Sequence, residues 1–294
     1  MEVSKLFTVT PMSRRFELEP GGTYEGAVTV INPADATESF DYKVYVAPYG
    51  VVGDEYSVDM LTESSYSQIK DWITIEKPTG SLQPNQSDEV HYTIKVPKDV
   101  PAGGQYAAIV VSQNDETKAA EEGNNVAVKD IFELASLIYG EVRGETVHKG
   151  EILENNIPGF VTEAPIMVEA LVSNDGNIHE NAEIKIRVTD ALSGRLIVGG
   201  DESVAGDYSE IVMPETTRKI SREIKDDLPI LGIVHVEQKI AYNGETSEVA
   251  RDVIICPAWF MVLIGVVLSV IVAIIVRIVL KDRKKKREVE RLGV

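Results

Sequence analysis

The sequence almost lacks cysteine, since Cys256 is the single thiol among 294 residues. No intrachain disulfide can form, and zinc–thiolate sites, thiol nucleophiles and cysteine redox pairs are excluded. A location outside the cell stays open, because domains of about 100 residues or more can be stabilised by their hydrophobic cores without disulfides.

Motifs for catalysis and for cofactor binding are also missing. The glycine pairs at 103–104 and 199–200 fall at expected β-turns, whereas a phosphate-binding loop joins a strand to a helix. No G-x-S-x-G nucleophile elbow occurs. None of the four histidines has a second His, Cys or paired acid at metal-ligand spacing; they are His91, His148, His179 and His235. We therefore predict no catalytic, cofactor-binding or metal-binding residue and no enzymatic activity.

Basic residues are scarce outside the C-terminal end. The chain has 47 acidic and 29 basic residues, a net charge of −18. Residues 1–256 alone carry 44 acidic and 21 basic residues, a net charge of −23. Repulsion from phosphate groups disfavours nucleic acid as a partner of this segment.

One uncharged apolar run interrupts this polar composition. Residues 258–276 contain no charge over 19 positions, and a helix rising about 1.5 Å per residue would cross a bilayer core of about 30 Å. We predict a transmembrane helix over residues 257–280, with amphipathic side chains at its two membrane interfaces. These interface residues are Trp259, Phe260, Arg277 and Lys281.

The charges around this span predict its orientation. Residues 281–294 hold seven basic and three acidic residues, and positive residues beside a span stay on the cytoplasmic side. The sequence thus predicts a single-pass type I protein of the cell membrane, with the acidic part outside and the tail in the cytoplasm.

The first 16 residues contain no apolar signal-peptide region. Either a signal peptide was removed or omitted, or the protein is tail-anchored with residues 1–256 in the cytosol. The basic tail favours the first explanation.

Alternation with a period of two dominates residues 1–256. Around residue 92, for example, inward-facing apolar residues alternate with polar ones. Clusters of Pro, Gly, Asn and Asp separate such segments and reverse the chain. We expect half-buried antiparallel strands in β-sandwiches.

An internal repeat divides these strands into two sets. Residues 28–32 (VTVIN) match residues 170–174 (ALVSN) at an offset of 142, and a second strand starts ten residues after each Asn. Pro84 and Pro214 each precede a further strand by six residues. The predicted fold is all-β, with two tandem immunoglobulin-like β-sandwiches followed by one transmembrane helix. The first sandwich is predicted over 1–144 and the second, membrane-proximal one over 145–252.

Three details of the first sandwich are less regular. Tyr106 opens a strand two residues before Ala108, which we expect to point inward, and so resembles the tyrosine corner of immunoglobulin-like domains. Residues 114–125 are expected to form a long exposed loop. Residues 131–142 fit the spacing of a last strand and of a short helix, and both readings stay open.

Tyrosines are concentrated between residues 42 and 66, which hold five of the 11 in the chain. Tyr49, Tyr56 and Tyr66 fall in a segment too long for a plain hairpin. Exposed tyrosines offer rigid contact area and a hydroxyl to a protein or glycan, so these three are candidate ligand contacts. The alternative is that the segment packs on its own sheet.

Several segments resemble the WxL-interacting surface proteins of bacteria. The resemblance rests on residues 9–11 (VTP), 18–22 (LEPGG), 28–32 (VTVIN), 100–106 (VPAGGQY) and 109–112 (IVVS). It implies a peptidoglycan-binding-type first domain, a second domain that contacts a host, one C-terminal span and a basic tail. No individual binding residue is implied.

The expected function is that of a non-catalytic, membrane-anchored cell-surface binding or adhesion protein. Its two sandwiches would bind cell-wall glycan or a surface protein of the envelope. The alternative is a tail-anchored cytosolic adaptor that resembles the major-sperm-protein-type sandwiches. No cofactor is expected in either case.

Overall fold

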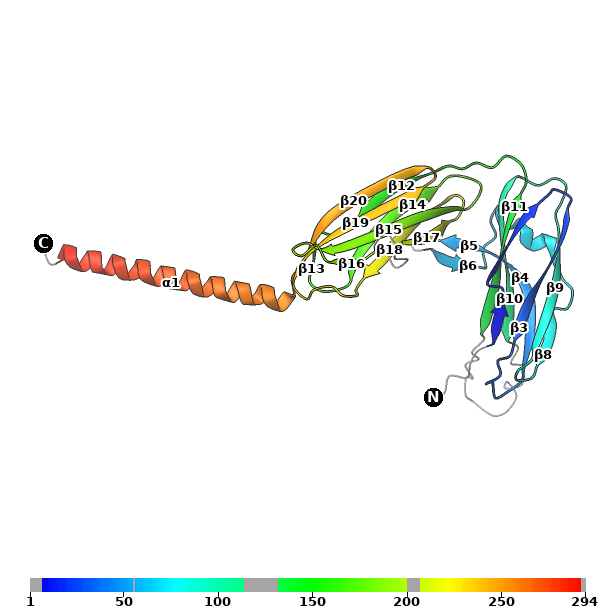
Figure 1. The fold of residues 1–294 in the computed structure, drawn as a ribbon, viewed down its shortest axis with the longest axis horizontal. Helices are drawn as coiled ribbons and strands as arrows, with labels where there is room; N and C mark the ends of the chain where they lie inside the picture. The colour runs from blue at the N-terminus through cyan, green and yellow to red at the C-terminus, as the bar shows by residue number, and fades with distance from the viewer. Residues whose placement is uncertain (1–6, 55, 114–131, 200–206, 292–294) are drawn as a thin grey trace.

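The computed structural model describes the chain except for residues 1–6, 55, 114–131, 200–206 and 292–294. It is all-β, with two tandem immunoglobulin-like β-sandwiches followed by one apolar helix, α1 (Ala258–Arg291), as Figure 1 shows. The expected loop at 114–125 lies outside the described residues.

The first sandwich consists of two facing sheets, with strand orders β1-β3-β9-β7 and β2-β11-β10-β4-β8. A separate hairpin, β5-β6, leaves the end of β4. The elements are β1 (Thr8–Thr10), β2 (Ser13–Leu18), β3 (Thr23–Ile31), β4 (Phe40–Pro48), β5 (Gly50–Val52), β6 (Ser57–Asp59), the 3-10 helix η1 (Gln68–Trp72), β7 (Ile73–Ile75), β8 (Thr79–Leu82), β9 (Ser87–Lys95), β10 (Gly103–Gln113) and β11 (Glu133–Val142). Because β11 is a strand, the helical reading of residues 131–142 is wrong for the part described.

The second sandwich has sheets of order β12-β14-β18 and β13-β20-β19-β15-β16, with β17 also paired to β15. Its strands are β12 (Gly150–Asn156), β13 (Phe160–Val161), β14 (Ile166–Asn174), β15 (Glu180–Asp190), β16 (Leu196–Val198), β17 (Asp207–Val212), β18 (Thr216–Ile224), β19 (Gly232–Tyr242) and β20 (Glu245–Ile255). β20 continues three residues beyond the expected end at Asp252, since it pairs with β19 along its whole length.

The two sandwiches repeat the same pairing. Val28 faces Val90 across β3 and β9, and Ala170 faces Ile220 across β14 and β18. In both copies the alternating side chains fill a separate core between the sheets.

The Asn that ends each repeated strand has a structural role. The Asn32 amide donates to the carbonyls of Glu38 (3.0 Å) and Leu82 (3.1 Å). The Asn174 amide donates to the carbonyls of Ile178 (2.8 Å) and Val212 (2.9 Å). Both side chains are buried, and three of these four hydrogen bonds are buried as well, so each Asn satisfies buried carbonyls of its own sandwich.

The copies differ at one sheet edge. β9 lies between β3 and β7, whereas β18 pairs with β14 alone within the described residues. The second sandwich thus lacks a described counterpart of β7.

Candidate binding site at the sandwich junction and the open β18 edge

The three candidate tyrosines lie where the two sandwiches meet, a contact called the junction below. The β5-β6 hairpin reaches from the first sandwich towards β17 and β18 (Figure 1). Tyr49 is buried at the hairpin base, with its ring 6.1 Å from that of Tyr139 in an edge-to-face arrangement. Burial raises the pKa of Tyr49.

Tyr56 fixes the hairpin to the second sandwich. Its hydroxyl lies 2.6 Å from the hydroxyl of Thr216 and accepts the N–H of Met213 at 2.5 Å. The Arg218 guanidinium lies 4.4 Å from the centre of the Tyr56 ring. Burial raises the pKa of Tyr56 even though these donors and Arg218 act to lower it.

Tyr66 lies at the same junction. Burial, together with a hydrogen bond to Glu215, raises its pKa to about 12. The structure therefore brings Tyr49, Tyr56 and Tyr66 together against the second sandwich. Ligand contact by these tyrosines stays a prediction.

Tyr106 is not a tyrosine corner. Its hydroxyl accepts the backbone N–H of His179 (2.9 Å) and lies 3.1 Å from His179 Nδ1, so it bonds to the other sandwich and not to its own loop. Ala108 shares this junction face with Tyr106, while Ala107 and Ile109 face the sandwich core. The expected inward orientation of Ala108 is therefore wrong.

A glycine-dependent contact adjoins Tyr106. Gly104 N–H donates to the Asn177 carbonyl at 2.7 Å, and the Asn177 amide donates to Ala102 O at 3.1 Å. Gly103 has φ of +119°, and a Cβ there would overlap Asn177. Residues 102–104 of the first sandwich thus meet Asn177 of the second across the junction.

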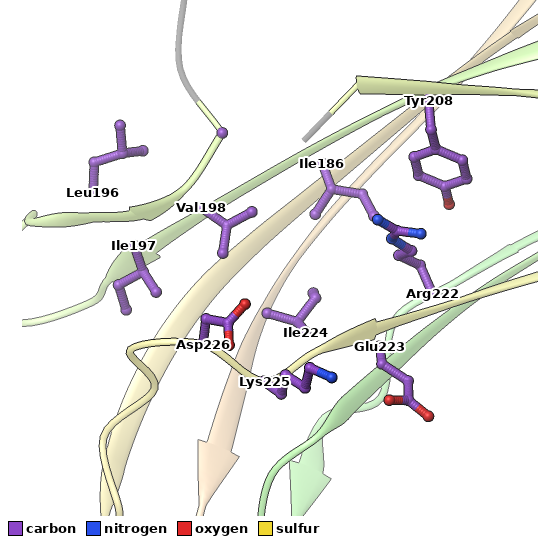
Figure 2. A pocket seen from close by; sticks show the side chains of 11 residues that line it. Ile186, Leu196, Ile197, Val198, Tyr208, Arg222, Glu223, Ile224, Lys225 and Asp226 are labelled. Atoms are coloured by element: carbon purple, nitrogen blue, oxygen red, sulfur yellow. The ribbon is translucent and has the colours of Figure 1, made fainter. Parts of the chain in front are cut away.

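A cavity opens at the edge of the second sandwich, and we call it the edge pocket. It has a volume of about 420 Å³ and lies between β16 and β17 on one side and the end of β18 on the other. Figure 2 shows the apolar side chains of Ile186, Val198 and Ile224 among its lining residues, together with the charged Lys225 and Asp226.

Arg222 is the unusual residue of this pocket. It shares the inward face of β18 with Ile220 and Ile224, which are both 4% exposed, yet Arg222 itself is exposed. Its guanidinium lies 5.1 Å from the centre of the Tyr208 ring (Figure 2). Burial raises the pKa of Tyr208 to about 12, although Arg222 acts to lower it.

Sequence reasoning missed the edge pocket. When the repeat is aligned at Pro84 and Pro214, Arg222 occupies the position equivalent to Tyr92, which is 1% exposed in the first core. An arginine at an inward-facing position of a strand was therefore the sequence feature that could have indicated this pocket.

The predicted membrane-interface residues lie at both ends of the apolar part of α1. The segment Ala258–Lys281 is long and apolar enough to cross a membrane, with a mean hydropathy of 3.1. Trp259 and Phe260 stack edge to face near its start, and Arg277 and Lys281 lie near its end. Cys256 precedes the helix, and its N–H donates to Val161 O at 3.0 Å.

Among the described residues, no group of three or more His, Cys, Asp or Glu side chains could hold a metal ion.

Comparison with known proteins identifies no family. No family model matches the chain, and no curated protein matches it. Among solved structures, the class 5 fimbrial chaperone CfaA is 15% identical over 86% of this chain and all of its own, with a TM-score of 0.37. The YadV chaperone is 8% identical over 84% and 99% of the two chains, with a TM-score of 0.39. A PapD-like domain of human CEP192 is 16% identical over 49% and 93%, with a TM-score of 0.32.

Proposed function

We propose that this chain is a single-pass protein of the cell surface whose two sandwiches bind a partner outside the membrane without catalysis. The partner is a cell-wall glycan or another envelope protein. The tail would lie in the cytoplasm, as the basic residues beside the span favour.

The observation that carries the proposal is the way the helix joins the second sandwich. β20 ends at Ile255 and α1 begins at Ala258, so only Cys256 and Pro257 separate them. None of the apolar window of Ala258–Lys281 is covered by the rest of the described chain. An uncovered apolar helix of this length is stable in lipid and unfavourable in water. The second sandwich would therefore stand directly on the bilayer.

The junction supports a display role. Its polar contacts use backbone groups and tyrosine hydroxyls of both sandwiches, which restrains their relative motion. A restrained pair presents one continuous surface to a partner and loses less conformational entropy on binding.

The test is binding by the full chain in lipid nanodiscs. We would measure saturable binding to purified peptidoglycan and, separately, to envelope proteins extracted from the producing cells. An unrelated single-span protein in identical nanodiscs is the control. The proposal predicts saturable binding to at least one of the two. Binding to neither, or sandwiches located in the cytosol, would overturn it; the second result would favour a cytosolic adaptor.

A further inference from the structure

The two sandwiches allow an internal comparison at their β18 and β9 edges. With the repeat aligned, Tyr92, Thr93 and Ile94 of β9 correspond to Arg222, Glu223 and Ile224 of β18. The first three residues pair with β7, in the register Ile73 to Ile94 and Ile75 to Tyr92. The matching three line the edge pocket. The pocket thus lies where the first sandwich holds its own fourth strand.

The backbone of β18 is oriented to accept such a strand. Hydrogen-bonding groups of an antiparallel strand point to alternate sides along the chain. Lys219 N–H points away from β14, because it donates to Asp54 O of the β5-β6 turn at 2.7 Å. Ser221 and Glu223 share this parity, and no described residue bonds to their outward backbone groups. In the first sandwich, His91 has the position of Ser221, and its carbonyl accepts the N–H of Glu76 at 3.0 Å.

The side chains behind this edge define what an added strand must carry. A residue opposite Ile224 would face the apolar interior formed by Ile186 and Val198. In the first sandwich Ile73 fills the equivalent place and is 8% exposed. An apolar side chain is therefore the matching occupant at this position.

The position opposite Arg222 demands a different residue. Inward-pointing charges are a common protection of edge strands, because a purely apolar strand would bury the charge without a partner. A strand with a carboxylate there would pair with the guanidinium. The charge therefore makes the edge selective for acidic segments and unfavourable for wholly apolar ones.

We propose that the β18 edge and the edge pocket bind an extended segment of a partner protein. The segment pairs antiparallel with residues 221–225, inserts an apolar side chain opposite Ile224, and places an Asp or Glu two residues later, opposite Arg222. This inference specifies a protein as the partner in the binding role proposed above. It rests on that proposed function only for the location of the partner outside the membrane.

A peptide derived from β7 is a suitable probe, because its register against the equivalent edge is known. The probe is a blocked peptide of residues 71–77 (DWITIEK) carrying Ile75→Glu, with the Ile75→Lys peptide and the unchanged peptide as matched controls. Binding to the full chain in nanodiscs is followed by fluorescence anisotropy. The Ile75→Glu peptide should bind about ten-fold more tightly than either control, as expected for a partly desolvated charge pair.

Two variants of the chain locate the binding. Arg222→Glu should reverse the preference, so that the Ile75→Lys peptide binds more tightly, while Arg187→Glu, on an outward-facing position of β15, should leave it unchanged. Glu223→Pro removes an outward N–H without touching the pairing to β14 and should abolish binding. Circular dichroism would check that each variant remains folded.

Absence of saturable binding by all three peptides would overturn the inference and leave Arg222 as edge protection only. A preference unchanged in Arg222→Glu, or full binding to a folded Glu223→Pro, would overturn it as well. These outcomes do not depend on membrane topology, so failure here is distinct from failure of the proposed function.

Discussion

At the scale of single residues, the junction depends on side chains whose hydroxyl or ring serves both sandwiches. Tyr106 is fully buried, and its ring packs edge to face with those of Tyr139 and His179, at 5.7 and 5.6 Å. Its hydroxyl is the described partner of the His179 backbone N–H. The phenol thus combines apolar packing with satisfaction of a polar group from the other sandwich.

Tyr106→Phe removes this hydroxyl and keeps the ring. The His179 N–H then loses its acceptor, and we expect the free energy of unfolding to fall by about 1–3 kcal/mol. Denaturant titration of the full chain in detergent measures the change. Tyr45→Phe is the matched control, because the Tyr45 hydroxyl bonds an exposed Glu133 carboxylate and its loss should cost less than about 0.5 kcal/mol. Equal effects of the two variants would contradict the role given to Tyr106.

His179 should make the junction sensitive to acid. Its burial lowers its pKa below the usual 6.5, and the nearby Arg15 lowers it further. The unfolded chain therefore binds a proton as pH falls through about 6.5 while the folded chain does not, so stability is complete above that pH and decreases below it. The free energy of unfolding, measured by denaturant titration at pH values from about 7.5 to about 5.5, one unit either side of the usual histidine pKa, should decrease towards the lower pH. A His179→Gln variant with the same slope would rule out His179 as its source.

At the scale of elements, the Asn at the end of β3 and of β14 fixes the same crossing in both sandwiches. Each amide joins its strand to the following loop and to the strand that crosses back. This explains in physical terms why the repeat is clearest around these residues.

Asn174→Ala should destabilise the second sandwich specifically. It leaves two buried carbonyls without their donor, a loss of about 2–4 kcal/mol if each costs about 1–2. Hydrogen exchange followed by mass spectrometry should show faster exchange in β14 and β17, with the first sandwich core unchanged. Asn156→Ala, at an exposed position, is the control and should leave exchange as it is. Uniform acceleration through both sandwiches would contradict the assignment.

Much of the fold could be predicted from the sequence because most strands are buried on one face. Alternation then gives both the strand and its inward side, as in β9, where Val90, Tyr92 and Ile94 are buried and His91 is exposed. β10 is different, because residues 103–111 are all buried. One face lies against the sandwich core and the other against the junction, so alternation could not assign the side of Ala108 or Tyr106.

The junction and the edge pocket were predictable only in part, because local sequence patterns do not encode contacts between distant segments. The concentration of tyrosines marked a segment that lies at the junction. A contact between domains, however, pairs residues 160 positions apart, such as Tyr56 and Thr216, and no local pattern encodes it. The edge pocket lies where the described residues of the second sandwich provide no counterpart of β7, and it becomes visible only when the two sheets are compared.

At the scale of the whole molecule, the chain consists of a joined pair of sandwiches attached by two residues to an uncovered apolar helix. Residues 1–256, with a net charge of −23, precede the apolar segment of that helix, and the basic residues after Leu280 follow it. The proposal that the sandwiches are displayed on the outer face of a membrane is based on these features.

Thiol labelling in intact producing cells tests this display most directly, because the chain contains one native cysteine. In a Cys256→Ala background, Ser81→Cys on the exposed surface of β8 and Lys286→Cys in the basic tail are each treated with a membrane-impermeant maleimide. The account predicts that Ser81→Cys is labelled in intact cells and that Lys286→Cys is labelled only after lysis. Labelling of Lys286→Cys in intact cells, with Ser81→Cys protected until lysis, would contradict it.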